Sequence, residues 1–122
     1  MNDAASQSAI YPSLKHRRVV ITGGGSGIGA GLVEAFVRQG ARVHFIDVLE
    51  TDSAALAERL AGAAHPPVFH RCDLKDAEAI ARTFGRIGAV DVLVNNAAND
   101  DRHTIEDVTP PTVFVARSPL PL

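Results

Sequence analysis

A glycine-rich stretch, Thr22–Gly29, constrains the fold more than any other part of this sequence. It follows a β-branched apolar run, Val19–Ile21, and it precedes a helical pattern of apolar residues that ends at Gly40. A strand that leads into a glycine-rich turn and then a helix presents backbone N–H groups to a phosphate. The glycines alone could form a plain flexible turn, but the flanking strand and helix patterns favour a phosphate-binding turn.

Strand and helix patterns alternate along the rest of the chain. We expect strands at 18–22, 42–47, 68–72 and 90–94, and helices at 29–39, 53–61 and 76–87. Thr51 or Asp52 is the expected N-cap of the second helix. The alternation predicts an α/β fold, namely a Rossmann-type parallel sheet with helices on both faces, incomplete at about four strands.

Asp47 stands at the end of the second predicted strand, twenty residues after Gly27. From that position a carboxylate can accept hydrogen bonds from the ribose hydroxyls of an adenosine. A 2′-phosphate would be repelled there, and no arginine directly follows Asp47, so the residue favours NAD over NADP. The competing interpretation is a solvated loop carboxylate.

The third and fourth predicted strands also end in polar residues. Asp73 could hydrogen-bond an adenine amino group, or it could cap the following helix. Asn95 and Asn96 need partners, which could be backbone groups that tie strands together, a cofactor ribose, or both. The polar segment Asn99–His103 is either a solvated loop or a substrate-contact loop.

Composition narrows the remaining function classes. The net charge is −2, which does not favour nucleic acid or an anionic membrane, and the single cysteine excludes an internal disulfide. The histidines show no ligand spacing, so we expect no metal site. No apolar run approaches the roughly 20 residues of a membrane helix, and the start lacks a signal-peptide pattern, so the cytoplasm is the expected location. Tyr11 and Lys15 have the spacing Tyr-x-x-x-Lys, which carries catalysis in one large enzyme family. Pro12 disfavours a helix there and the pair precedes the first predicted strand, so we interpret the match as a coincidence.

Together, the motifs Thr22-Gly-x-x-x-Gly-Ile-Gly29, Asp47, Cys72-Asp-Leu74 and Asn95-Asn-Ala97 resemble the short-chain dehydrogenase/reductase family. The resemblance covers residues 14–108. The finer pattern at 10–15 and 99–103 is similar to NAD-dependent sugar dehydrogenases of the xylose or aldose type. Ala98 departs from the glycine that the family usually has.

The resemblance implies NAD as cofactor and a sugar or alcohol as substrate. In the family, the glycines shape the turn that binds the pyrophosphate. By this resemblance, Asp47 would bind the adenosine ribose and Asp73 would bind the adenine. Asn95 would lie along the cofactor. The expected cofactor-binding residues are Gly23, Ser26, Gly27, Ile28, Gly29, Asp47, Asp73, Leu74, Asn95 and Ala97. Full-length relatives are expected to be homo-oligomers.

Catalysis in the family uses a tyrosine, a lysine four residues later, a serine and an asparagine. No position here matches that set in its expected place, because the only tyrosine is Tyr11. We therefore assign no catalytic residue. The leading hypothesis is the cofactor-binding half of an oxidoreductase, inactive alone. The alternatives are a non-catalytic dinucleotide-binding module and a truncated or frameshifted product without function.

The chain is predicted to consist of three segments. We expect a loose arm over 1–13, an NAD-binding Rossmann half-domain over 14–108, and an irregular proline-rich tail over 109–122. The loss of helical pattern at Pro110 suggests a shifted reading frame, which the downstream coding DNA would test. The last predicted strand would then be left as an unpaired apolar edge.

Overall fold

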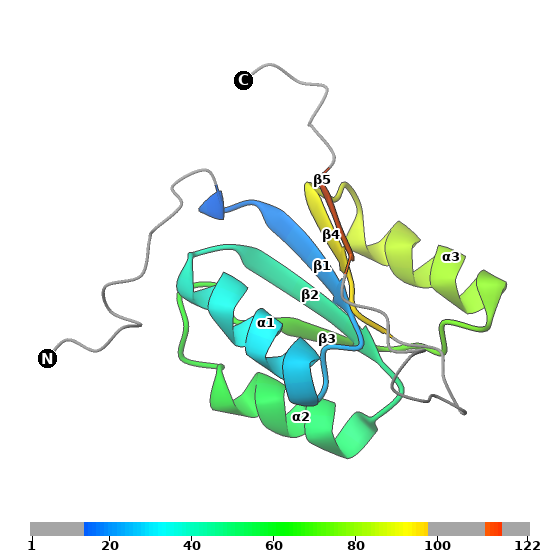
Figure 1. Cartoon of the computed structure of the whole chain (residues 1–122), viewed down its shortest axis with the longest axis horizontal. Helices are drawn as coiled ribbons and strands as arrows, with labels where there is room; N and C mark the ends of the chain where they lie inside the picture. Colours follow the sequence, from blue (N-terminus) through cyan, green and yellow to red (C-terminus); the bar gives the residue numbers. More distant parts are fainter. Residues whose placement is uncertain (1–13, 98–111, 116–122) are drawn as a thin grey trace, which may run out of the picture.

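The computed structural model describes residues 14–97 and 112–115, and it shows one five-stranded sheet (Figure 1). The strands are β1 (Arg18–Thr22), β2 (Arg42–Asp47), β3 (Val68–Arg71), β4 (Val92–Asn95) and β5 (Thr112–Val115). The helices are α1 (Gly27–Arg38), α2 (Glu50–Arg59) and α3 (Ala77–Ile87). The order across the sheet is β3-β2-β1-β4-β5, and the pairs among the first four strands are all parallel. The predicted α/β class is confirmed.

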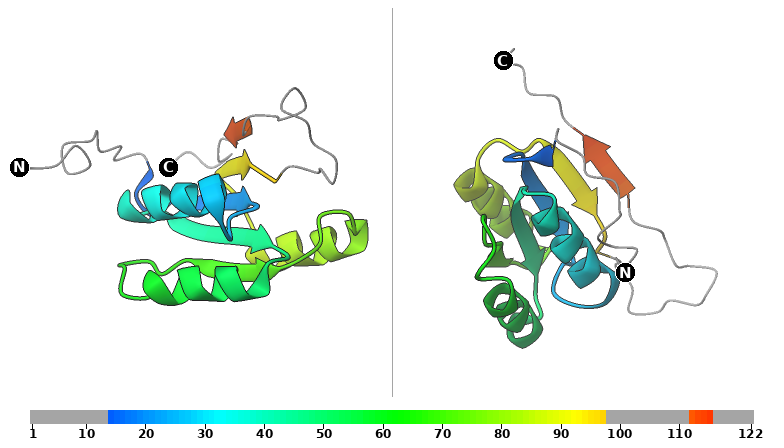
Figure 2. Two further views of the ribbon diagram at one scale, coloured as in Figure 1. Left: turned by 60° about the horizontal axis from the view of Figure 1, so that its bottom comes forward. Right: turned by 90° about the vertical axis from the view of Figure 1, so that its left-hand side faces the viewer.

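The helices lie on both faces of the sheet, as expected. Figure 2 shows, in its right-hand view, α3 on one side of the strands and α1 on the other. Side chains alternate along β1, so that Val19 and Ile21 join the cluster that contains Val33 of α1, while Val20 joins the cluster that contains Ile87 of α3. Central strands are therefore apolar on both faces, which is typical of parallel sheets.

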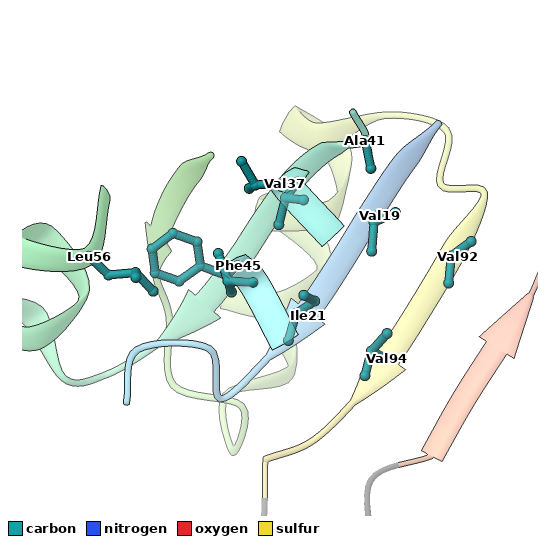
Figure 3. Close-up of a cluster of buried hydrophobic side chains, with 10 residues drawn as sticks. Val19, Ile21, Val37, Ala41, Phe45, Leu56, Val92 and Val94 are labelled. Carbon is teal, nitrogen blue, oxygen red and sulfur yellow. The ribbon is translucent and has the colours of Figure 1, made fainter. Parts of the chain in front are cut away.

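The larger cluster lies between the sheet and helices α1 and α2. Phe45 and Val94 are fully buried in it, and Leu56 of α2 reaches it from the side (Figure 3). Burial of one such side chain contributes about 1.5–3 kcal/mol. This core fixes the strands relative to each other and so fixes the edge where their carboxyl ends meet.

Several element boundaries differ from the prediction. Helix α2 begins at Glu50 with Leu49 as its N-cap and no side-chain cap, so the expected caps Thr51 and Asp52 are wrong. Both residues lie inside the first turn, where Glu50 and Asp52 carry negative charge that favours a helix N-terminus. Helix α1 begins at Gly27 rather than Gly29. Gly40, with φ of 82°, follows the C-cap Gln39, which agrees with the predicted helix end.

Strand β5 lies inside the segment that we expected to be irregular. It pairs antiparallel with β4, with Val92 opposite Val115 and Asn95 opposite Thr112. The expectations of an irregular structure throughout 109–122 and of an unpaired β4 edge are therefore wrong. Two prolines prevent a helix from running through them, but a strand can begin directly after them. Thr-Val-Phe-Val is a strongly β-forming sequence. The arm over 1–13, with Tyr11, and the segment Asn99–His103 lie outside the described residues.

Candidate functional site

A cleft of about 570 Å³ opens at the carboxyl ends of the parallel strands. It brings together many of the residues that the motifs singled out: Gly23, Ser26, Asp47, Asp73, Leu74, Asn95 and Ala97. The remaining lining residues are Ile46, Val48, Leu49, Cys72, Lys75 and Asn96. The volume is in the range of about 300–1,000 Å³ that small-molecule and cofactor sites occupy.

The three remaining predicted residues, Gly27, Ile28 and Gly29, are not in the cleft lining. Gly27 and Ile28 open helix α1, and the Ile28 side chain is 70% exposed. Gly29 is buried against the turn, where an added Cβ would collide with the carbonyl oxygen of Gly23. Gly29 therefore lets the turn pack closely against helix α1, and it does not line the cleft.

Gly23 needs to be glycine for two reasons. Its φ is +69°, a conformation that costs little only for glycine, and a Cβ there would lie 2.9 Å from the Cα of Ala97. The turn after β1 therefore lies directly against the backbone after β4. Any larger residue at position 23 would push these two backbone segments apart.

The hydroxyl of Thr22 connects β1 with the segment after β4. Thr22 Oγ1 donates to Asn95 Oδ1 at 2.9 Å and accepts from the backbone N–H groups of Asn96 and Ala97 at 3.0 and 3.1 Å. The Asn96 side-chain amide donates to the Gly23 carbonyl at 3.0 Å. The asparagines therefore tie the strands together, which is one of the two expected roles, and Asn95 also lines the cleft.

Asp47 is held in place by two backbone N–H groups. Its Oδ2 accepts from Gly25 at 2.8 Å and its Oδ1 accepts from Leu49 at 3.0 Å. The side chain is half-buried at the end of β2, beside the glycine turn. A carboxylate has about four lone-pair sites, so Asp47 can still accept hydrogen bonds from a diol in the cleft.

Asp73 does not cap α3, so that alternative is wrong. The N-cap is Asp76, whose side chain accepts from the N–H groups of Glu78 and Ala79. Asp73 instead accepts from the N–H of Lys75 at 2.9 Å, and it stays exposed along the cleft. Cys72 is buried beside it in the α3-side cluster, as expected for a small apolar residue.

The sequence placed Thr22 and Gly25 in the turn but did not reveal their contacts, and it did not identify Val48 and Leu49 as lining residues. The contacts of Thr22 have no local sequence signal, because its partner Asn95 lies 73 residues further along the chain. Val48 and Leu49 are exposed apolar residues directly after Asp47, and both line the cleft. An apolar pair after a strand-end carboxylate could have been recognised as a surface for a flat ring.

Three observations concern metal binding, the paired histidines and membrane spans. Within residues 14–97, no group of three His, Cys, Asp or Glu side chains is placed to hold a metal ion. His44 and His70, whose ring nitrogens lie 2.9 Å apart, are not among the lining residues of the cleft. No helix of the described part has the length and apolar character required to cross a bilayer.

Curated relatives match this chain closely over part of their length. The chain is 66% identical over 102 residues to the D-xylose 1-dehydrogenase of Caulobacter vibrioides, covering 84% of this chain and 41% of that protein. It is 50% identical over 107 residues to the probable galactose dehydrogenase GalD of Rhizobium meliloti, covering 84% of this chain and 42% of that protein. The chain thus spans about two fifths of the length of these relatives.

Solved structures show the same fold. A short-chain type dehydrogenase/reductase from Mycobacterium ulcerans matches 72% of this chain and 34% of its own, with a TM-score of 0.67 and 23% identity. The Pseudomonas aeruginosa RhlG/NADP active-site complex matches 74% of this chain and 38% of its own, with a TM-score of 0.63 and 29% identity. The first likeness concerns the fold alone.

A family model described as short chain dehydrogenase matches residues 17–115. The match begins just before β1 and continues past Pro110 to the end of β5. It covers most of the sequence, including every strand of the sheet. The chain belongs to the short-chain dehydrogenase family.

Proposed function

We propose that these residues form the NAD-binding part of an NAD-dependent dehydrogenase that acts on a sugar. The observation that carries the proposal is the position of Asp47, held by Gly25 and Leu49 at the rim of the cleft. A carboxylate at this point accepts from both ribose hydroxyls and repels a 2′-phosphate. NAD fits this environment better than NADP.

The other lining residues support a dinucleotide along the cleft. Gly23 lines the cleft and lets the turn pack against the Ala97 backbone, and the N-terminus of α1 favours a nearby anion by about 0.3–1 kcal/mol. Asp73 and Leu74 would border the adenine, with Val48 and Leu49 as its apolar surface. Asn95 and Ala97 would lie along the nicotinamide half. When bound, NAD supplies the hydride acceptor.

The substrate class follows from the named relatives, which are dehydrogenases of xylose and galactose. We infer an aldose sugar as substrate of the complete protein. These 122 residues alone are expected to bind NAD without oxidising the sugar, because their only tyrosine, Tyr11, precedes β1. A cytoplasmic location and homo-oligomeric assembly of full-length relatives stay predictions.

Calorimetric titration of the purified chain with NAD and with NADP tests the cofactor. We expect NAD to bind and NADP to bind about tenfold more weakly or not at all, because of like-charge repulsion at Asp47. Asp47→Asn should reduce this preference, because it removes the charge and keeps a side chain of the same shape. Equal affinity for both dinucleotides in the unmodified chain would contradict the assignment of NAD.

Turnover is tested separately, by following NADH formation with D-xylose and D-galactose. We expect none from the 122-residue chain. The same chain should still be stabilised against heat by NAD, since binding to the native state alone raises stability. NAD binding without turnover would agree equally with a non-catalytic dinucleotide-binding module, whereas NADH formation would refute the expected inactivity.

A further inference from the structure

The hydroxyl of Ser53 is buried without a partner in the part of the chain that the structure describes. Ser53 lies in the first turn of α2, and its side chain is 0% exposed. Its backbone N–H donates to Leu49, but its Oγ makes no hydrogen bond within the described residues. A buried hydroxyl usually has a partner, so an orphaned one calls for an explanation.

Ser53 lies next to the ribose-binding carboxylate that we propose. A Cβ built on Gly25 would overlap Ser53 Oγ and would lie 2.9 Å from Asp47 Oδ2. The hydroxyl on α2 and the carboxylate at the end of β2 therefore border the same glycine Cα. The N–H of that glycine already donates to Asp47 Oδ2 at 2.8 Å.

We propose that Ser53 is a positioning residue for Asp47, and that its hydroxyl donates to Oδ2 when the adenosine ribose of NAD is bound. The inference rests on the proposed function. The Gly25 and Leu49 amides hold the carboxylate from the backbone side, so a ribose diol would bind it from the cleft. Rotation about the Cα–Cβ bond of Ser53 moves Oγ, so Ser53 can add a third donor to a group with about four lone-pair sites. Gly25 is required because any side chain there would separate the two groups.

Ser53→Ala in the 122-residue chain tests the proposal through two measurements. The melting temperature of the ligand-free variant should be equal or higher, because the hydroxyl has no partner to lose. The dissociation constant for NAD should rise about tenfold, because a hydrogen bond to a charged group is lost in the complex. A purely structural serine would instead lower the melting temperature and leave the dissociation constant unchanged.

Thr83→Val is the matched control, because Thr83 is a buried hydroxyl residue on α3 and is 2% exposed. It should leave NAD affinity unchanged. If Ser53→Ala does not fold, Ser53→Cys keeps a group of similar size with a weaker donor and should still weaken NAD binding. Unchanged NAD affinity in the folded variant overturns the role of Ser53 and leaves the proposed function intact. Failure of the unmodified chain to bind NAD overturns both.

Discussion

Thr22 Oγ1 donates to Asn95 Oδ1 at 2.9 Å, and this bond joins the carboxyl ends of β1 and β4 at the centre of the sheet. The same hydroxyl accepts from two consecutive backbone N–H groups, those of Asn96 and Ala97. One buried oxygen therefore organises the backbone that lies against Gly23. The contact therefore holds together residues that line the cleft, since Gly23, Asn95, Asn96 and Ala97 are all lining residues.

Thr22→Val should destabilise the chain by about 1–3 kcal/mol, because the isosteric side chain leaves two N–H groups and an amide oxygen without their partner. Urea denaturation gives the free energy of unfolding. Thr22→Ser keeps the hydroxyl and loses only a methyl group, so it should cost less. Equal stability of the valine and serine variants would show that the hydroxyl contributes nothing.

Gly23→Ala should disrupt both the fold and the cofactor site. The positive φ costs about 1–3 kcal/mol for a residue with a Cβ, and that Cβ would press on the Ala97 backbone at 2.9 Å. We expect a lower melting temperature and loss of NAD binding by calorimetry.

Gly31→Ala is the control for this substitution. Gly31 lies inside α1, with no atom within 4 Å of an added Cβ, so alanine there should stabilise the chain by roughly 0.5–1 kcal/mol. If both alanine variants bind NAD as the unmodified chain does, the turn does not approach a ligand closely.

The parallel strands could be predicted because their signals are local. Strands β1 and β2 occupy the expected residues, since each is a short apolar run that ends at a polar residue or a turn. Strand β5 was not predicted, because a run of four β-forming residues after two prolines is too short to indicate a strand without its partner β4. The start of α2 was missed because a non-capping residue, Leu49, occupies the N-cap.

In the candidate site, too, the features with a local sequence signal could be predicted, and those that depend on distant partners could not. Asp47 and Asp73 could be predicted to share one cleft, because parallel strands place their carboxyl ends at one edge. The contacts of Gly25 with Asp47 and of Thr22 with Asn95 depend on loop geometry and on which strands are neighbours. No local pattern encodes either contact.

Stability should rise with pH through the acidic range because of His44. Burial, followed by the charges of His70 and Arg18, lowers the pKa of His44 from 6.5 to about 4. The unfolded chain therefore binds more protons than the folded chain between pH 6.5 and about 4, and the free energy of unfolding falls as the pH drops through that window. Burial also lowers the pKa of His70, whose Nε2 lies 2.9 Å from His44 Nδ1, so protonation of both rings would break their contact.

Chemical denaturation of the unmodified chain and of His44→Gln at pH 7 and pH 5 measures this contribution. Glutamine does not titrate, so the variant should lose less stability between the two pH values. Parallel losses in the two proteins would mean that other groups account for the pH dependence.

Substitution of Asp76 should mainly lower the stability of the chain, whereas substitution of Asp73 should mainly weaken NAD binding. Asp76 caps α3 by accepting from the N–H groups of Glu78 and Ala79, each at 3.1 Å, so Asp76→Ala should cost about 0.5–2 kcal/mol of stability. Asp73 caps no helix and lines the cleft, so Asp73→Ala should cost less stability but weaken NAD binding. Thermal unfolding in the absence and presence of NAD measures both effects. A fall in stability without a change in affinity for Asp73→Ala would remove Asp73 from the proposed adenine site.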